Sequence, residues 1–130
     1  MKIYISARWQ RRQEMQDYAK LLGEHECCSR WLSHKFDEYN HKPAPNGVLE
    51  ISAAQDILDV IACDVFIGFT EQPEVYSTGG RHVELGVALA LGKEIILIGP
   101  KENVFHHLPV AYSWCKDFDD ALDVICLIQS

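Results

Sequence analysis

Several features are missing from this sequence of 130 residues, and each absence narrows the class of protein. No apolar run reaches the ~20 residues of a membrane-spanning helix, and the start MKIYIS is typical of a strand rather than of a signal peptide. Basic residues are in the minority, and a formal charge of −7 argues against a surface that binds nucleic acid polymers. A nucleotide needs only a local group of donors, so it stays open as a ligand, whereas we expect no membrane and no nucleic acid polymer as partner.

The cysteines and histidines lack the spacings of a disulfide framework or a metal site. There is no CxxC, the number of cysteines is odd, and two are adjacent: Cys27, Cys28, Cys63, Cys115 and Cys126. Such a set is typical of free thiols in a reducing compartment, so we expect a cytoplasmic protein. His106 and His107 are adjacent, which rarely suits one ion, and no HxxxH motif is present. We expect neither a metal nor a cofactor.

Repeats and low-complexity segments are absent too, and what remains is an alternation of predicted strands and helices over one domain, residues 1–130. The third and fourth strands are continuous apolar runs, which is typical of central parallel strands covered on both faces. The sequence predicts an α/β fold: a flavodoxin-like or Rossmann-like three-layer sandwich with a five-stranded parallel sheet. The expected strands are 2–6, 27–32, 64–69, 94–99 and 112–115. The expected helices are about 10–23, from about 50 onward, 83–91 and 118–128.

The second predicted helix has an apolar face at helical spacing, formed by Ile51, Ala54, Ile57, Leu58 and Ile61. We expect this face to pack on the core. Asp56 lies opposite it on the helical wheel, so periodicity alone places this carboxylate in solvent.

Residues 77–93 (STGGRHVELGVALALGK) form a glycine turn followed by an apolar helix in which Glu84 is the one charged residue between 83 and 91. Free N–H groups and the helix dipole favour an ionised carboxylate at such a position, which suits a nucleophile or a cation stabiliser. A plainer interpretation is that Glu84 only complements the dipole. A capping box would place Ser or Thr where Arg81 stands. Because this helix is apolar nearly all round, we expect a second subunit on its outer face, in a homodimer or higher homo-oligomer.

Ligands of such folds bind at the carboxyl ends of the strands, and this topology brings Glu84 near Ser6 and Arg8. Cations after the first strand oppose the dipole of the next helix, so Arg8 is the best candidate for binding a phosphate. A second cradle of backbone N–H groups is predicted at Ser77, Thr78, Gly79 and Gly80, where an ordinary helix cap is the alternative. Tyr4, Trp9 and Trp31 either stack on a base or belong to the core.

Three segments resemble the nucleoside 2-deoxyribosyltransferase-like superfamily, which includes the 2′-deoxynucleoside 5′-phosphate N-hydrolases: KIYISARW, AAQDILDVIACDVFIGFTEQP and GGRHVELGVALALGKEIILIGP. The resemblance implies that Glu84 of the Glu-Leu-Gly motif is the covalent nucleophile, and that Asp56 contacts the sugar or helps the base to depart. It also brings Tyr4 and Asp64 into the substrate site, although Asp64 otherwise reads as a structural residue between helix and strand. His82 and Val83 before the nucleophile, and residues 7–9 in the first turn, differ from the family pattern.

We therefore expect an N-glycosidase or 2-deoxyribosyltransferase that cleaves a nucleoside or nucleoside monophosphate through a glycosyl-Glu84 intermediate. The alternatives are an NAD glycohydrolase or phosphoribohydrolase-like enzyme, and a nucleotide-binding module that senses without cleaving. The residues expected to contact substrate, besides Glu84 and Asp56, are Tyr4, Ser6, Arg8, Trp9, Asp64, Thr78, Gly79, Gly80, His82 and His106.

Overall fold

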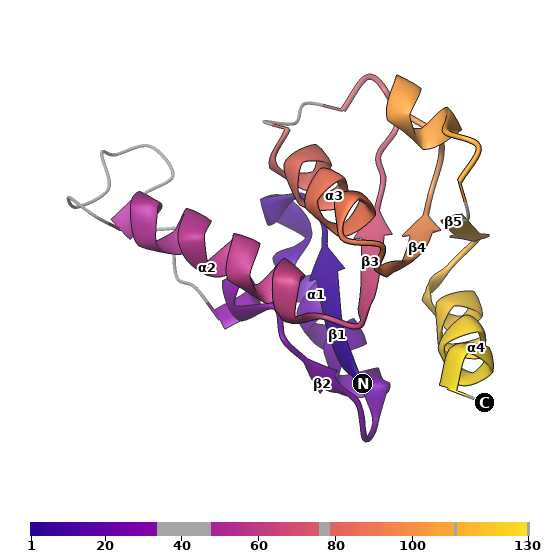
Figure 1. Ribbon diagram of the computed structural model, residues 1–130, viewed down its shortest axis with the longest axis horizontal. Coiled ribbons are helices and arrows are strands. Elements are labelled where there is room, and N and C mark those ends of the chain that lie inside the picture. The colour runs from indigo at the N-terminus through magenta and orange to yellow at the C-terminus, as the bar shows by residue number, and fades with distance from the viewer. Residues whose placement is uncertain (34–47, 76–78, 111, 130) are drawn as a thin grey trace.

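The computed structural model of the protein describes residues 1–33, 48–75, 79–110 and 112–129. Strands and helices alternate along the chain, and short 3₁₀ turns (η) join several of them (Figure 1). The elements are β1 (Lys2–Ser6), η1 (Trp9–Arg11), α1 (Arg12–Ala19), η2 (Lys20–Leu22), β2 (Glu26–Cys27), η3 (Arg30–Ser33), α2 (Val48–Ala62), β3 (Val65–Phe69), α3 (Gly80–Ala90), β4 (Glu94–Ile98), η5 (Val104–His107), β5 (Tyr112–Cys115) and α4 (Phe118–Gln129).

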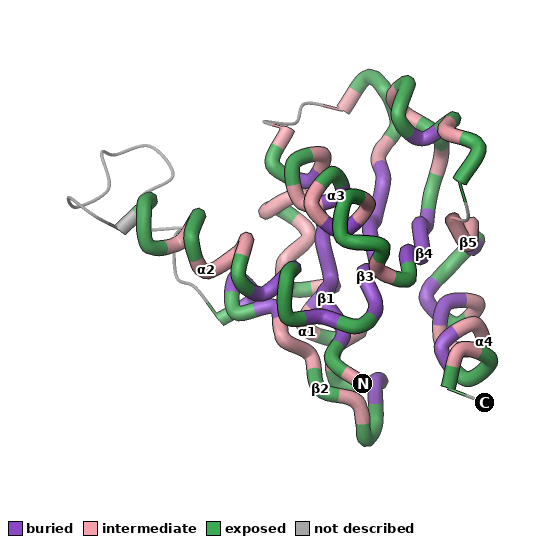
Figure 2. Tube along the Cα trace, viewed as in Figure 1, coloured by how far each residue is buried: buried purple, intermediate pink, exposed green. Residues whose placement is uncertain are grey.

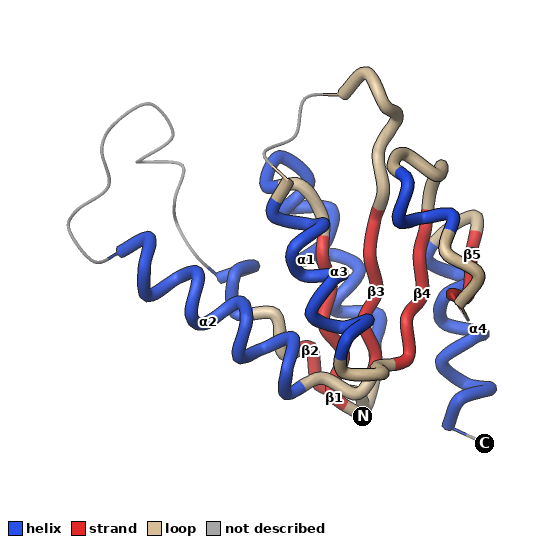
Figure 3. Tube along the Cα trace, turned by 45° about the horizontal axis from the view of Figure 1, so that its top comes forward, coloured by secondary structure: helices blue, strands red, loops and turns tan. Residues whose placement is uncertain are grey.

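The five strands form one parallel sheet in the order β2-β1-β3-β4-β5. Since parallel crossovers are right-handed, the helices that follow β1 and β3 must cover opposite faces, because their next strands lie in opposite directions. On one face α1 and α4 meet through Tyr18 and Phe118, whose rings stack 4.5 Å apart. On the other face α2 and α3 are neighbours (Figure 3). The predicted α/β flavodoxin-like, three-layer fold with a five-stranded parallel sheet is confirmed.

The apolar runs of the sequence form the central strands of this sheet. Every residue of β3 is buried, and so are the last four residues of β1 and of β4 (Figure 2). Parallel strands covered by helices on both faces require this continuous burial. Among the described residues, no helix is both long enough and apolar enough to span a membrane.

The second strand is shorter than the predicted 27–32, because side chains take over the edge of β1 after Cys27. The Ser29 hydroxyl accepts a hydrogen bond from the Ile5 backbone N–H at 2.7 Å, and the Trp31 indole N–H donates to the Ile5 carbonyl at 2.8 Å. With both polar groups of Ile5 satisfied in this way, the chain leaves the sheet and turns into η3.

The predicted inner face of α2 is also wrong. Ile51, Leu58 and Ile61 are exposed, whereas Asp59 and Val60 are buried and Asp56 is half-buried. The helix is therefore rotated so that its carboxylates face the protein. Asp59 is held by Arg30, whose backbone N–H and guanidinium both donate to its carboxylate. Burying this paired carboxylate leaves an apolar stripe of α2 in solvent.

Candidate functional site

The site lies at the switch point of the sheet, between β1 and β3, where the strand order reverses. β1 and β3 are adjacent, yet the helices that follow them lie on opposite faces, which opens a crevice beyond the carboxyl ends of these two strands. The segments that reach this edge are the turn after β1, the residues after β3 and the start of α3 (Figure 1). Ligand sites of open α/β sheets are found at this position.

Two side chains of β1 hold the carboxylate of Glu84. Tyr4 and Ser6 are two residues apart, so they point to the same face of the sheet, toward α3. The Tyr4 hydroxyl donates a hydrogen bond to Oε2 of Glu84, and the Ser6 hydroxyl donates to Oε1 at 2.9 Å. Tyr4 is fully buried and stacks on Phe66 at 5.7 Å, which fixes the position of its hydroxyl. Both carboxylate oxygens of Glu84 are thus oriented by a rigid strand.

Glu84 lies deeper in its helix than the sequence suggests. Gly79, with φ of 90°, caps α3 and Gly80 is its first residue, so Glu84 is the fifth residue and the first turn holds no acidic side chain. The effect of the helix dipole falls off within the first turn. The expectation that free N–H groups and the dipole keep Glu84 ionised is therefore wrong.

Burial decides the protonation of Glu84 instead. Removal of water raises its pKa from 4.5 to about 7, against the hydrogen bonds from Tyr4 and Ser6, which lower it. The charge of Asp56 raises this pKa further, and that of Arg81 lowers it. The carboxyl therefore titrates in the neutral rather than in the acidic range. A carboxyl poised in this way can act as a nucleophile or exchange a proton.

Asp56 lies beside this pair rather than in bulk water. Its side chain is half-buried on the inward side of α2, and its charge raises the pKa of Glu84 and, after burial and Glu84, that of Tyr4. The solvent position that periodicity indicated is wrong, and the structure brings Asp56 to the face that holds Glu84. Two carboxyls in one desolvated site provide the groups that acid–base or nucleophilic chemistry needs.

The turn after β1 places a cation and an aromatic ring at the same edge. Arg8 is half-buried, and its Nε is shielded from water without a hydrogen-bond partner among the described residues. Trp9 begins η1; its ring lies 6.1 Å from that of Trp31, and the Arg12 guanidinium covers its face at 4.3 Å. A buried donor of this kind is expected to gain an acceptor when an anion binds.

The start of α3 and the loop after β4 supply two histidines. His82 Nδ1 lies 3.0 Å from the Asn103 side-chain amide, and His106 Nδ1 accepts from the Glu102 backbone N–H at 3.1 Å. Burial lowers the pKa of both imidazoles. They line a recess between α3 and the sheet together with Ser6. Gly79 and Gly80 form the turn into the helix, whereas the predicted Thr78 lies outside the described residues.

Asp64 does not belong to this cluster, contrary to what the resemblance implied. It precedes β3, at the amino edge of the sheet, and its carboxylate accepts a hydrogen bond from the Lys2 backbone N–H at 2.7 Å. The carboxyl ends of β1 and β3 lie at the opposite edge. Asp64 therefore joins the starts of two strands.

Sequence reasoning missed the ion pair of Arg81 with Glu102, which links α3 to the loop after β4. A signal was present, because Arg81 is a charged residue at the head of an apolar helix and Glu102 follows the end of a central strand. Within the described part of the chain, no group of three His, Cys, Asp or Glu side chains is placed to hold a metal ion.

The fold and this half-buried, hydrogen-bonded carboxyl describe an α/β protein with a candidate ligand site at the carboxyl edge of its sheet. No known protein family and no curated protein matches the sequence significantly. Solved structures do match: a CMP N-glycosidase of Clostridium botulinum, BcmB, is 22% identical over 98% of this chain and 99% of that chain, with a TM-score of 0.59. A 2-deoxyribosyltransferase of Bacillus psychrosaccharolyticus is 19% identical over 95% and 91%, with a TM-score of 0.66. This chain shares the fold of both proteins.

Proposed function

We propose that this protein cleaves the N-glycosidic bond of a nucleoside or nucleoside monophosphate, with Glu84 as the nucleophile. The observation that carries the proposal is the Glu84 carboxyl, desolvated and held by Tyr4 and Ser6 at the switch point of the sheet. Its support from other proteins is the fold shared with a CMP N-glycosidase and a 2-deoxyribosyltransferase.

The reaction follows the two-step logic of retaining glycosidases. One oxygen of ionised Glu84 bonds to the anomeric carbon while the C–N bond breaks, and the bonding electrons leave with the base, which takes a proton. Asp56 positions the sugar or supplies that proton. Water, or a nitrogen of an acceptor base, then attacks the same carbon, the ester bond breaks, and Glu84 regains its charge while the attacking group loses a proton. Two inversions give net retention.

Arg8 and Trp9 are the side chains that would select the substrate. The shielded Nε of Arg8 supports a role in binding a 5′-phosphate. Trp9 lies at the same edge, and a base that displaced the Arg12 guanidinium would stack on its ring. An Arg8→Gln variant should lose affinity for monophosphates and keep its affinity for nucleosides, measured by calorimetric titration.

A substrate panel tests the activity. Nucleosides, 2′-deoxynucleosides and their 5′-monophosphates are incubated with the protein, with and without an acceptor base, and free base is separated by chromatography. Release that depends on Glu84, together with an acid-quenched peptide that contains Glu84 and is heavier by one pentosyl group, is expected. Glu94→Gln, at the start of β4, is the matched control. Cleavage of NAD alone would favour the glycohydrolase alternative, and binding of an intact nucleotide without release would favour a sensing module.

We also propose that two copies associate through α2 and α3. These neighbouring helices expose a set of large apolar side chains: Leu49, Ile51, Leu58, Ile61, Val83 and Leu91. Val83 adjoins Glu84 in sequence, whereas Leu58, two residues from Asp56, lies on the opposite side of α2. An apolar surface of this kind is typical of an interface, and a second copy is the partner that every solution of this protein contains.

The cysteines support a reducing compartment such as the cytoplasm, which we propose as the location. All five lie within the described residues and are free thiols. Burial raises the pKa of Cys28 to about 12 and that of Cys63 to about 11, so neither is a thiolate at neutral pH. Neither Cys28 nor Cys63 therefore competes with Glu84 for the role of nucleophile.

A further inference from the structure

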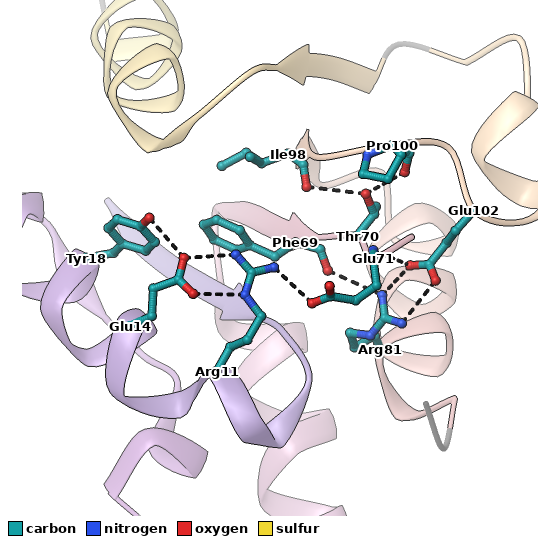
Figure 4. Close-up of polar contacts among 10 residues, drawn as sticks. All are labelled: Arg11, Glu14, Tyr18, Phe69, Thr70, Glu71, Arg81, Ile98, Pro100 and Glu102. Atoms are coloured by element: carbon teal, nitrogen blue, oxygen red, sulfur yellow. Dashed lines mark hydrogen bonds and ion pairs between the residues drawn. The ribbon is translucent and has the colours of Figure 1, made fainter. Parts of the chain in front are cut away.

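A buried ion pair links the first turn of α3 to the loop after β4. The side chains of Arg81 and Glu102 are 7% and 8% exposed, and both guanidinium Nη atoms donate to the carboxylate, Nη2 at 3.2 Å (Figure 4). Nη1 of Arg81 also donates to the Phe69 carbonyl at 3.3 Å, at the end of β3. Replacing a buried ion pair by apolar residues often leaves the stability of a protein unchanged. Stability alone therefore does not explain why Arg81 and Glu102 are paired here.

Further polar contacts extend this pair to the surrounding loops. Glu102 Oε1 accepts from the Glu71 backbone N–H at 3.0 Å, and the Glu71 carboxylate pairs with Arg11 at 2.9 Å (Figure 4). Asn103, the residue after Glu102, contacts His82, the residue after Arg81. The loops after β3 and β4 and the start of α1 are thus joined around the first turn of α3.

Glu84 lies three residues after Arg81 on the same helix, so any shift of that first turn relative to β1 would move its carboxylate away from Tyr4 and Ser6. Given the proposed function, on which this inference rests, we propose that Arg81 and Glu102 are positioning residues. Their pairing holds the start of α3 against the ends of the strands, so that Glu84 keeps its hydrogen bonds to Tyr4 and Ser6. It also leaves no net charge at the pair itself.

The charges around Glu84 make the proposal testable beyond folding. Tyr4 and Ser6 face the Glu84 carboxyl from β1, and both act on it through hydrogen bonds. Two charged side chains also act on it: Asp56 of α2 opposes its ionisation, and Arg81 of its own helix favours it. Removal of Arg81 alone leaves Glu102 unpaired and should raise the pKa of Glu84. Removal of Glu102 alone leaves the cation unpaired and should lower it. Displacement of Glu84 from Tyr4 and Ser6, whose hydrogen bonds lower its pKa, would add a rise in every variant and would lower kcat.

The experiment uses Arg81→Met, Glu102→Gln and the double variant, with Asp17→Asn on α1 as the charge-matched control. Titration of the Glu84 carboxyl by carbon NMR, with Glu84→Gln to assign the signal, needs no substrate. We expect opposite shifts on the order of half a pH unit in the single variants and a smaller shift in the double variant. The kcat of each variant should fall about tenfold or more, with less effect on KM.

A kcat as in the wild type in all three variants, with or without a shift in the titration, would overturn the proposal. The double variant retains a neutral pair of groups, so it remains informative where a single variant fails to fold. Opposite shifts of Glu84 in a protein that releases no base would contradict the proposed function and leave the charge coupling in place, which separates the two failures.

Discussion

Replacing Glu84 by Gln should stabilise the protein, increasingly so as pH rises from about 4.5 to 7. The folded pKa of Glu84 is raised from 4.5 to about 7 by burial, so its contribution to stability is fully present below pH 4.5 and is lost as pH rises to 7. At about 1.4 kcal/mol per pH unit, keeping the carboxylate ionised in the folded state lowers the free energy of unfolding by about 3 kcal/mol. Glu84→Gln lacks this titration and keeps an oxygen that can accept from Tyr4.

Thermal and denaturant unfolding of both proteins at pH 4 to 8.5 measures the effect. The difference in unfolding free energy should grow by about 3 kcal/mol between pH 4 and pH 8, equal to a Tm difference of ~10 °C for a chain of this length. The value at pH 4 serves as the baseline for the altered hydrogen bonds, and Glu94→Gln, an exposed position, is the control. A difference that is the same at both ends of the pH range would refute the claim that the site holds a desolvated carboxyl.

Activity should follow the same titration, with kcat/KM rising as pH increases through about 7, because the nucleophile must be ionised; a profile flat from pH 5 to 8 would contradict this. Tyr4→Phe removes a hydrogen bond that lowers the pKa of Glu84, so the acidic limb should move to higher pH and kcat should fall about tenfold or more; an unmoved limb would show that this bond is unimportant. Asp56→Asn removes a repelling charge, so the limb should move to lower pH while kcat falls, and a shift upward would exclude the assigned coupling. Leu58→Glu should convert dimers to monomers in light scattering, whereas Leu127→Glu, at a still more exposed position on α4, should not; a monomeric wild-type protein would end the dimer proposal.

The sheet could be predicted from the sequence because its strands obey local rules. The apolar runs of β3 and β4 are long enough to be central strands and are bounded by turn residues, so their burial on both faces follows from composition. The short β2 could not be predicted, because it ends where Ser29 and Trp31 bind the backbone of Ile5, two residues that lie 24 and 26 positions away in the chain. Hydrogen bonds of that separation leave no local pattern.

The candidate site likewise combines features set by neighbouring residues in the sequence with features set by residues distant in the chain. The glycine turn and Glu84 on the following helix are local features, and the sequence placed them at the correct edge of the sheet. The pKa of Glu84 depends on burial and on residues from β1 and α2, so an argument from the helix dipole alone predicted the wrong sign.

Helix α2 explains why periodicity misled. A helical wheel assumes that the apolar side faces the core of the same chain, yet here the inward side carries Asp56 and Asp59 and the apolar side faces out. Asp59 is held inside by Arg30, and Asp56 lies where its charge acts on Glu84. This orientation exposes large apolar residues while two carboxylates face inward. An exposed apolar surface lowers solubility unless another molecule covers it. The orientation of α2 therefore ties the proposed dimer to the proposed chemistry: the rotation that brings Asp56 to the nucleophile is the same rotation that exposes Leu58.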